Sequence, residues 1–301
     1  MSDRYRFLLL ATSALTFVLI VAGGVVCVTD SSRGCPDWPA CYGRLVPPPR
    51  IDSILEYTHR VIAGLTALLV VASAVVGWRH YRGIRWLHRP PAIAIALLFA
   101  VAIFGAVVVL HGLAPGYALL DIGSALSVLG LMVAATVVAF GRHAEPDLPD
   151  RLSFSTPLAR LARWTLLAVF VVLVSGVLVA APGSPVRCLG WPLFSGGLDV
   201  PGVRRWLALA RLLLAAAATL LVALLAARAW RVTQPPAVRP VALGLGLLLS
   251  ANVVAGLVAA LLGSPVWLLA AAALLASALW ATLVILVTLL ALPGARSNLP
   301  H

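Results

Sequence analysis

Eight apolar runs constrain this chain more than any other feature of its sequence. A bilayer core about 30 Å thick is crossed by roughly 20 apolar residues in an α-helix. With 62% hydrophobic and 11% charged residues, the 301-residue chain is too apolar for a soluble domain. We therefore predict an all-α membrane protein with eight transmembrane helices. The expected spans are Phe7–Val28, Leu55–Trp78, Pro91–His111, Tyr117–Phe140, Leu161–Ala181, Trp206–Ala227, Val241–Leu262 and Val266–Leu292.

The charges of the chain lie mainly between these runs. Its net charge of +12 comes from 22 basic residues, all of them arginine, against 10 acidic ones. Because these arginines flank apolar runs, they indicate topology and not a solvated surface for nucleic acid. Fourteen of them fall on the side of the N-terminus. The positive-inside rule then predicts a multi-pass protein of the cell membrane with both termini in the cytoplasm. Its long loops, 30–54 and 182–205, are expected to be external.

Three landmarks of the first half return about 150 residues later. The run Cys-Pro-Asp-Trp-Pro at 35–39 corresponds to Cys-Leu-Gly-Trp-Pro at 188–192, and Glu56–Arg60 corresponds to Leu207–Arg211. A Gly-Leu-Ala-Pro turn at 112–115 corresponds to Gly-Ser-Pro at 263–265. We predict two tandem four-helix bundles, 1–150 and 151–301, related by a pseudo-two-fold axis along the membrane normal.

The second copy has lost the reactive groups of the first. Phe194 replaces Cys41, Ala210 replaces His59, and Leu207 replaces Glu56. Any chemistry is therefore expected in the first half, and the second half is interpreted as a degenerate repeat.

Glu56 and His59 are the strongest functional candidates. At positions i and i+3 of a helix they project from one face, about 60° apart. A neutral imidazole facing a bundle interior suits an axial ligand of heme iron, and Glu56 could orient it or accept a proton. The alternative is that both residues anchor the helix at the water interface.

Four further residues are candidate ligand contacts. Arg60 and Arg211 recur at equivalent helix starts, where a guanidinium could bind a propionate or phosphate, or snorkel to the interface. His111 ends the third span and could approach His59, or lie at headgroup level. Asp121 lies one turn into the fourth span, where a lone carboxylate is costly and usually functional.

The four cysteines lie in or near the two external loops. Cys35 and Cys41 can close a small disulfide ring in an oxidising compartment, either as a loop staple or as a redox-active pair. Cys27 and Cys188 have no obvious mate in the sequence. Zinc is not expected, because no second Cys/His pair has ligand spacing in this loop.

These landmarks together resemble the heme A synthase family. The resemblance rests on eight spans, the repeat, the Cys-Pro-Asp-Trp-Pro-x-Cys-x-Gly loop and Glu-x-x-His-Arg at the start of span two. It implies oxidation of the C8 methyl of heme O to a formyl group during cytochrome oxidase heme maturation. It also implies catalytic roles for Glu56, Cys35 and Cys41. The expected partners are heme O, a heme O synthase and an external electron donor, and a homo-oligomer stays open.

The chain departs from the family pattern at three of its four heme-ligand histidines. Only His59 is present; Asp121 stands at the span-four position, Ala210 at the span-six position, and Ala271 or Ala272 at the span-eight position. The second half therefore lacks both ligands for heme b, and the sixth ligand of a substrate heme would be His111 or Asp121. The alternative function is a catalytically degenerate heme-binding or oxidase assembly protein. A transporter is favoured by the repeat alone.

Overall fold

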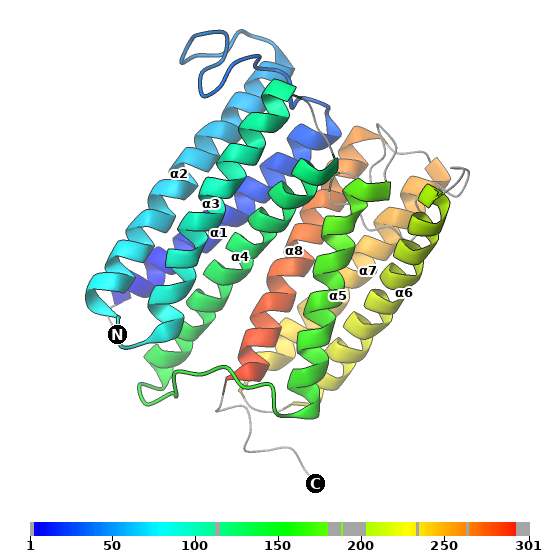
Figure 1. Cartoon of the computed structure of the whole chain (residues 1–301). Coiled ribbons are helices and arrows are strands. Elements are labelled where there is room, and N and C mark those ends of the chain that lie inside the picture. The colour runs from blue at the N-terminus through cyan, green and yellow to red at the C-terminus, as the bar shows by residue number, and fades with distance from the viewer. Residues whose placement is uncertain are drawn as a thin grey trace.

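A computed structural model of the chain describes residues 3–111, 115–179, 188, 203–232, 235–262 and 265–292. All eight helices are long and apolar enough to cross a membrane. Their bounds are α1 Asp3–Val28, α2 Ile51–His80, α3 Arg85–His111, α4 Pro115–Ala144, α5 Pro157–Val179, α6 Val203–Trp230, α7 Val238–Leu262 and α8 Val266–Ala291. The predicted eight-helix membrane fold is confirmed (Figure 1).

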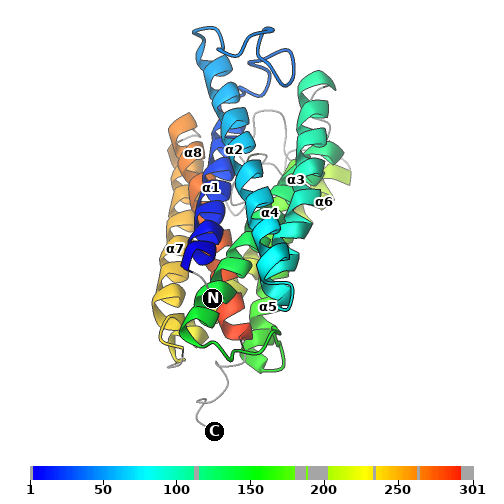
Figure 2. The same ribbon diagram turned by 90° about the vertical axis from the view of Figure 1, so that its left-hand side faces the viewer.

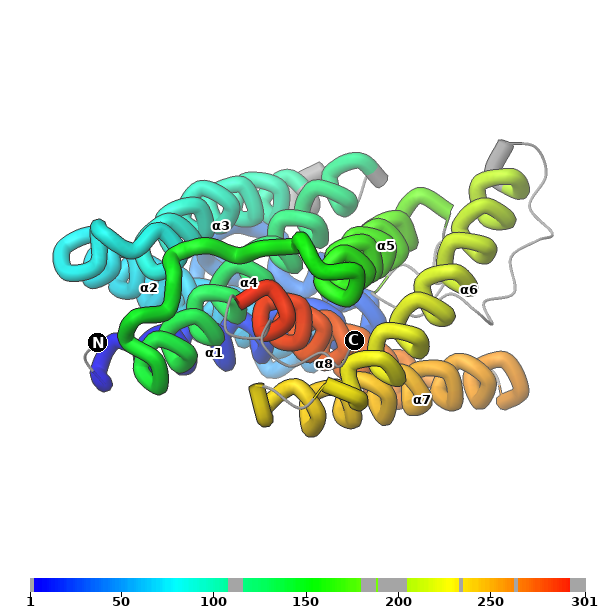
Figure 3. The backbone as a smooth tube through the Cα atoms, turned by 90° about the horizontal axis from the view of Figure 1, so that it is seen from below, coloured from blue at the N-terminus to red at the C-terminus, as the bar shows by residue number. Residues whose placement is uncertain are grey.

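The helices pack as two rings of four. In the first half, contacts run from α1 to α2, α2 to α3, α3 to α4 and back to α1, and the second half repeats this order from α5 to α8. The halves meet through α1 with α8, α4 with α8, and α4 with α5. Exchanging each helix for the one four places along leaves this pattern unchanged, as expected for a pseudo-two-fold repeat. Figure 3 shows α4 and α8 in the middle of the assembly.

One hydrogen bond joins the halves at their centre. The indole Nε1–H of Trp280 on α8 donates to the backbone carbonyl of Leu126 on α4 at 3.0 Å. Within the first ring, Ser13 pairs with Thr136 at 2.8 Å, linking α1 to α4. Between lipid-embedded helices, such side-chain bonds and close packing replace the hydrophobic effect as the source of association.

The third helix begins earlier than the sequence predicts. Pro91 was the expected start, but α3 begins at Arg85 and contains both Pro90 and Pro91. The carboxylate of Asp150, from the loop between α4 and α5, accepts the backbone N–H of Arg85 at 2.5 Å and of Trp86 at 3.3 Å. This tertiary cap satisfies donors that a helix start leaves unpaired, and a local reading of the sequence misses it.

The two ends of the molecule differ in packing. We call the end where α1 begins and α8 ends the terminal end, and the opposite end, which carries residues 29–50, the loop end (Figures 1 and 2). The first ring is closely packed toward the terminal end. Its fully buried residues include Tyr5, Leu9, Val70, Leu87, Val128, Met132 and Ala139. Toward the loop end, residues 121–125 of α4 and all of 57–65 of α2 are only half-buried or exposed. The loop end of this ring is therefore the less tightly filled part.

Candidate functional site

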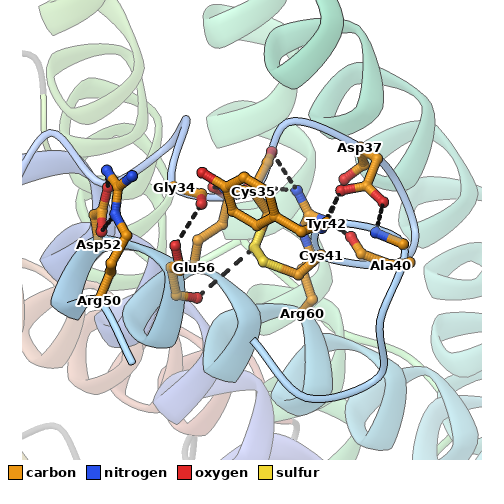
Figure 4. Close-up of a disulfide and its surroundings, with 12 residues drawn as sticks. Gly34, Cys35, Asp37, Ala40, Cys41, Tyr42, Arg50, Asp52, Glu56 and Arg60 are labelled. Carbon is orange, nitrogen blue, oxygen red and sulfur yellow. Dashed lines mark hydrogen bonds and ion pairs between the residues drawn. A yellow bond between two sulfur atoms is a disulfide. The ribbon is translucent and has the colours of Figure 1, made fainter. Parts of the chain in front are cut away.

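Glu56 lies near the start of α2, beneath the loop that carries Cys35 and Cys41 (Figure 4). Its side chain is buried, with 3% of the residue exposed. Oε2 accepts the backbone N–H of Cys35 at 2.9 Å, and Oε1 forms an ion pair with Arg60 one helical turn further on. The carboxylate therefore connects α2 to the loop through the Cys35 N–H, and Arg60 holds it on its own helix, each by a charge-assisted hydrogen bond.

Arg60 holds the same loop by its backbone carbonyls. One terminal nitrogen donates to the carbonyls of Asp37 at 2.7 Å and Ala40 at 2.6 Å. The other donates to Glu56 and lies 3.4 Å from the carbonyl of Cys35. These contacts engage both terminal nitrogens of the guanidinium with protein groups. The structure thus shows Arg60 bonded to the loop, and the propionate or phosphate contact that the sequence suggested for it stays a prediction.

Cys35 and Cys41 form a disulfide, and both residues are fully buried. The chain after it reverses in a tight turn, with Cys41 and Arg44 exchanging two backbone hydrogen bonds of 3.1 Å. Tyr42 and Gly43 at the centre of this turn both have positive φ, of 55° and 67°. This combination is that of a type I′ turn, in which glycine is the favoured second residue.

Asp37 caps this turn from within the ring of the disulfide. Its two carboxylate oxygens accept the backbone N–H groups of Tyr42 and Gly43, each at 2.6 Å. The hydrogen bonds from Gly43 and Tyr42 hold the pKa of Asp37 below its ordinary value. Asp37, which lies between the two cysteines, therefore stabilises the conformation of the loop.

Gly34 allows the loop to approach α2 closely. A Cβ atom there would lie 2.4 Å from the backbone carbonyl carbon of Asp52. The neighbouring contact is a hydrogen bond of 2.6 Å from the Ser53 hydroxyl to the Gly34 carbonyl. Only glycine permits this approach, which brings the Cys35 N–H within reach of Glu56.

His59 lies on the face of α2 that points into the first ring. Successive steps of 7, 11 and 18 residues place it in line with Thr66, Val70 and Gly77, which are buried. Gly23 of α1 lies against the imidazole, since a Cβ atom there would be 3.1 Å from Cε1 of His59. The buried Nδ1 of His59 has no hydrogen-bond partner within the described part of the chain. An imidazole with one unpaired nitrogen on the ring-facing side of α2 fits a ligand of heme iron.

Asp121 lies on α4 in line with Val128 and Met132, which pack into the core of the first ring. Its carboxylate makes no ion pair or hydrogen bond with any described residue. His111 is the last residue of α3, and its side chain lies outside the described part of the structure. The approach of His111 to His59 that the sequence suggested therefore lies outside the described residues. Those residues contain no cluster of three metal-ligating side chains.

The second half carries no donor at its equivalent heme positions. Ala210 on α6 is exposed, and Ala271 and Ala272 on α8 are half-buried. Since an alanine cannot ligate iron, these residues do not fit a bis-histidine heme b. Arg211 is buried and donates to the Ser175 hydroxyl at 3.3 Å and the Val172 carbonyl at 3.1 Å, both on α5.

A second disulfide was missed by the sequence reasoning. Cys27, in the last turn of α1, bonds to Cys188 of the long loop that precedes α6. It joins the two halves across 161 residues. The available signal was the number of cysteines: pairing Cys35 with Cys41 leaves two, one expected near the external end of the first span and one in the second external loop.

The sequence of this chain is similar to those of known proteins. Residues 6–284 match the COX15-CtaA family, described as cytochrome oxidase assembly protein. The chain is similar to the heme A synthases of Alkalihalophilus pseudofirmus (26% identity over 205 residues, 67% of this chain and 68% of that protein) and Staphylococcus haemolyticus (31% over 187 residues, 61% and 60%). It is also 29% identical to the heme A synthase of an Exiguobacterium species over 58% of each chain.

The matched part thus spans about three fifths to two thirds of these relatives. The family match, in contrast, covers all eight helices at least in part, and it contains the loop and the Glu56–Arg60 segment. The chain therefore belongs to the COX15-CtaA family of cytochrome oxidase assembly proteins.

Proposed function

We propose that the first half is a heme A synthase site, which oxidises the C8 methyl group of heme O to a formyl group. The observation that carries this proposal is the unit formed by Glu56, Arg60 and the Cys35–Cys41 loop, beside an interior histidine on the same helix. The relatives named heme A synthase support the same activity.

In this proposal His59 holds the substrate heme by its iron. The imidazole lies against Gly23 of α1, and its Nδ1 is unpaired within the described residues. Asp121 lies on the side of α4 that faces the first ring. Its carboxylate is our candidate for exchanging a proton with the bound heme or for contacting its iron. Gly23 leaves the imidazole room to take its position.

Glu56 and Arg60 act on the loop above the heme. Glu56 is held by the Cys35 N–H and Arg60, so a proton that arrives at its carboxylate removes the charge that strengthens both buried contacts. Arg60 is a positioning residue, since it holds the backbone of 35–40 in place. Converting a methyl to a formyl group is a four-electron oxidation, so an external redox partner is required.

Expression in cells that make heme O but no heme A tests this activity. We expect wild-type chain to yield formylated heme in pigment extracts, while His59→Ala and Glu56→Gln yield heme O alone. Equal membrane levels of all three variants provide the control. Stable wild-type protein without any formylated heme would contradict the enzyme proposal.

The second candidate is a heme-binding assembly protein without catalysis. It is favoured by the residues at three ligand positions, which are Asp121, Ala210, and Ala271 or Ala272. It predicts that purified chain carries heme with a Soret band that His59→Ala removes, while no formylated heme is made. The optical spectrum and the pigment extract together separate the two candidates.

A further inference from the structure

Arg211 is a buried cation inside the second ring. It lies on α6 with 5% of its surface exposed, within a predicted membrane span. Steps of 4, 7 and 11 residues place it in line with Ala215, Ala218 and Val222, which are fully buried in the core of that ring. The guanidinium therefore belongs to the bundle interior and not to the lipid face.

Within the described residues, Arg211 makes hydrogen bonds to uncharged groups alone. Nε donates to the Ser175 hydroxyl and one terminal nitrogen to the Val172 carbonyl. No carboxylate of the described residues lies within ion-pair distance of it. A guanidinium has five N–H donors, so most of its hydrogen-bonding capacity is left for another partner.

The equivalent arginine of the first half has the carboxylate partner that Arg211 lacks among the described residues. At the equivalent place in the first half, Arg60 pairs with Glu56 four residues earlier. In the second half Leu207 stands four residues before Arg211, so the cation is retained and the anion is lost. A buried charge without a counterion is strongly unfavourable in an apolar interior, and such a residue usually marks a binding site.

The sequence offers one internal alternative. Residues 151–301 contain 11 arginines and a single acidic residue, Asp199, which lies outside the described residues. The counterion of Arg211 in this half must therefore come from Asp199 or from a bound molecule.

A second group in the same ring also lacks a partner. Asn252 on α7 is 1% exposed; its Nδ2 donates to the Leu248 carbonyl, while its Oδ1 has no hydrogen bond to any described group. Buried polar atoms are almost always paired, by protein or by a bound molecule. Among the described residues, the interior of the second ring thus contains a cation without a carboxylate partner and an acceptor without a hydrogen-bond donor.

We propose that Arg211 binds the oxyanion, carboxylate or phosphate, of a lipid-soluble molecule in the interior of the second ring. The oxyanion supplies the missing countercharge through charge-assisted hydrogen bonds, and the surrounding apolar helices accommodate the hydrophobic body. This site is independent of heme O oxidation in the first half, because it uses none of the residues assigned there.

Thermal unfolding of the purified, delipidated full chain in detergent tests this proposal. The probes are phosphatidylglycerol, which carries a phosphate, metal-free protoporphyrin IX, which carries carboxylates, and dioleoylglycerol, which is uncharged. We expect one or both anionic probes to raise the Tm of wild-type chain, and dioleoylglycerol to leave it unchanged. Which anionic probe acts identifies the source of the oxyanion.

Variants on α6 test whether the rise in Tm depends on Arg211. In Arg211→Gln the response should require about tenfold more probe or more, because a charged hydrogen bond is lost. The control Arg205→Gln removes an exposed arginine of the same helix and should respond like wild type. Without probe, Arg211→Gln should be at least as stable as wild type, because an unpaired buried charge is gone. Should that variant fail to insert, Arg211→Lys keeps the charge and should respond at an intermediate concentration.

Asp199→Asn decides between the two sources of countercharge. We expect it to respond to the anionic probes as wild type does. The proposal is overturned if Asp199→Asn and Arg211→Gln lower the probe-free Tm equally, since the counterion is then internal. It is also overturned if dioleoylglycerol stabilises as well as the anionic probes, or if no probe acts on wild type.

Discussion

At the scale of single residues, the ion pair between Glu56 and Arg60 organises the candidate site. Their side chains are 4% and 12% exposed, whereas the nearby pair Arg50–Asp52 is 62% and 35% exposed. An exposed pair contributes about 0–1 kcal/mol, while breaking a buried one by removing a partner costs about 3–5 kcal/mol. The two pairs therefore make a matched comparison on one short segment.

Glu56→Gln should loosen the Cys35–Cys41 loop, because it leaves the Arg60 charge without its carboxylate partner. We expect Cys35 and Cys41 to be reduced and alkylated faster in this variant than in wild type, as measured by mass spectrometry after mild reduction. Asp52→Asn is the control and should alkylate at the wild-type rate. Equal alkylation rates in all three proteins would show that the Glu56–Arg60 ion pair does not stabilise the loop.

Gly23 and His59 provide a second prediction at this scale. Since a Cβ at residue 23 would lie 3.1 Å from the imidazole, Gly23→Ala should displace His59 and lower heme occupancy or shift the Soret band. Gly64→Ala is the control, because no atom lies within 4 Å of a Cβ at that position of α2. An unchanged spectrum in Gly23→Ala would mean that the imidazole does not hold the heme.

At the scale of elements, the loop 35–44 depends on the ionised carboxylate of Asp37. Its pKa in the folded protein lies below the ordinary value of 3.8, because the Gly43 and Tyr42 N–H groups stabilise the charged form. This stabilisation is complete above the ordinary pKa and is lost as the pH falls through the folded pKa.

Acidification from pH 6 to pH 3 should therefore loosen the turn at Tyr42 and Gly43. Amide hydrogen exchange of the loop peptide, corrected for the intrinsic pH dependence of exchange, measures this loosening. In Asp37→Asn the protection should already be low at pH 6 and change little with pH. A loop whose protection is constant in the wild type would show that another contact holds the turn.

The helices also show which of their bounds can be predicted from the local sequence. Each expected span overlaps its helix, because a bilayer demands a run of apolar residues that is visible without tertiary information. The start of α3 was misplaced because its cap, Asp150, is 65 residues away from Arg85 in the sequence. Helix ends set by such distant caps are not encoded in the neighbouring residues.

At the scale of the whole molecule, the Cys27–Cys188 disulfide joins the two halves beside the contact of α1 with α8. A cross-link that closes a longer loop restricts the unfolded chain more, and typical disulfides contribute about 2–4 kcal/mol. This one spans 161 residues, against 6 for Cys35–Cys41.

Replacing Cys27 and Cys188 by serine should lower the Tm of the full chain more than replacing Cys35 and Cys41 does. Differential scanning calorimetry of both double variants without reductant measures the two effects. The reverse order would indicate that the small loop, and not the link between the halves, limits the stability of the molecule.

The sequence by itself determined the eight-helix membrane fold, the repeat, and the residues from which a site could be built, because hydropathy and motif spacing are local properties. Only the tertiary structure decided what those residues do: Arg60 holds loop carbonyls, Cys27 pairs with Cys188, and Arg211 is buried without a carboxylate among the described residues. These outcomes depend on which backbone and side-chain groups meet across helices. In a chain with only 10 acidic residues, such contacts decide whether an arginine is paired with a carboxylate or can bind a ligand.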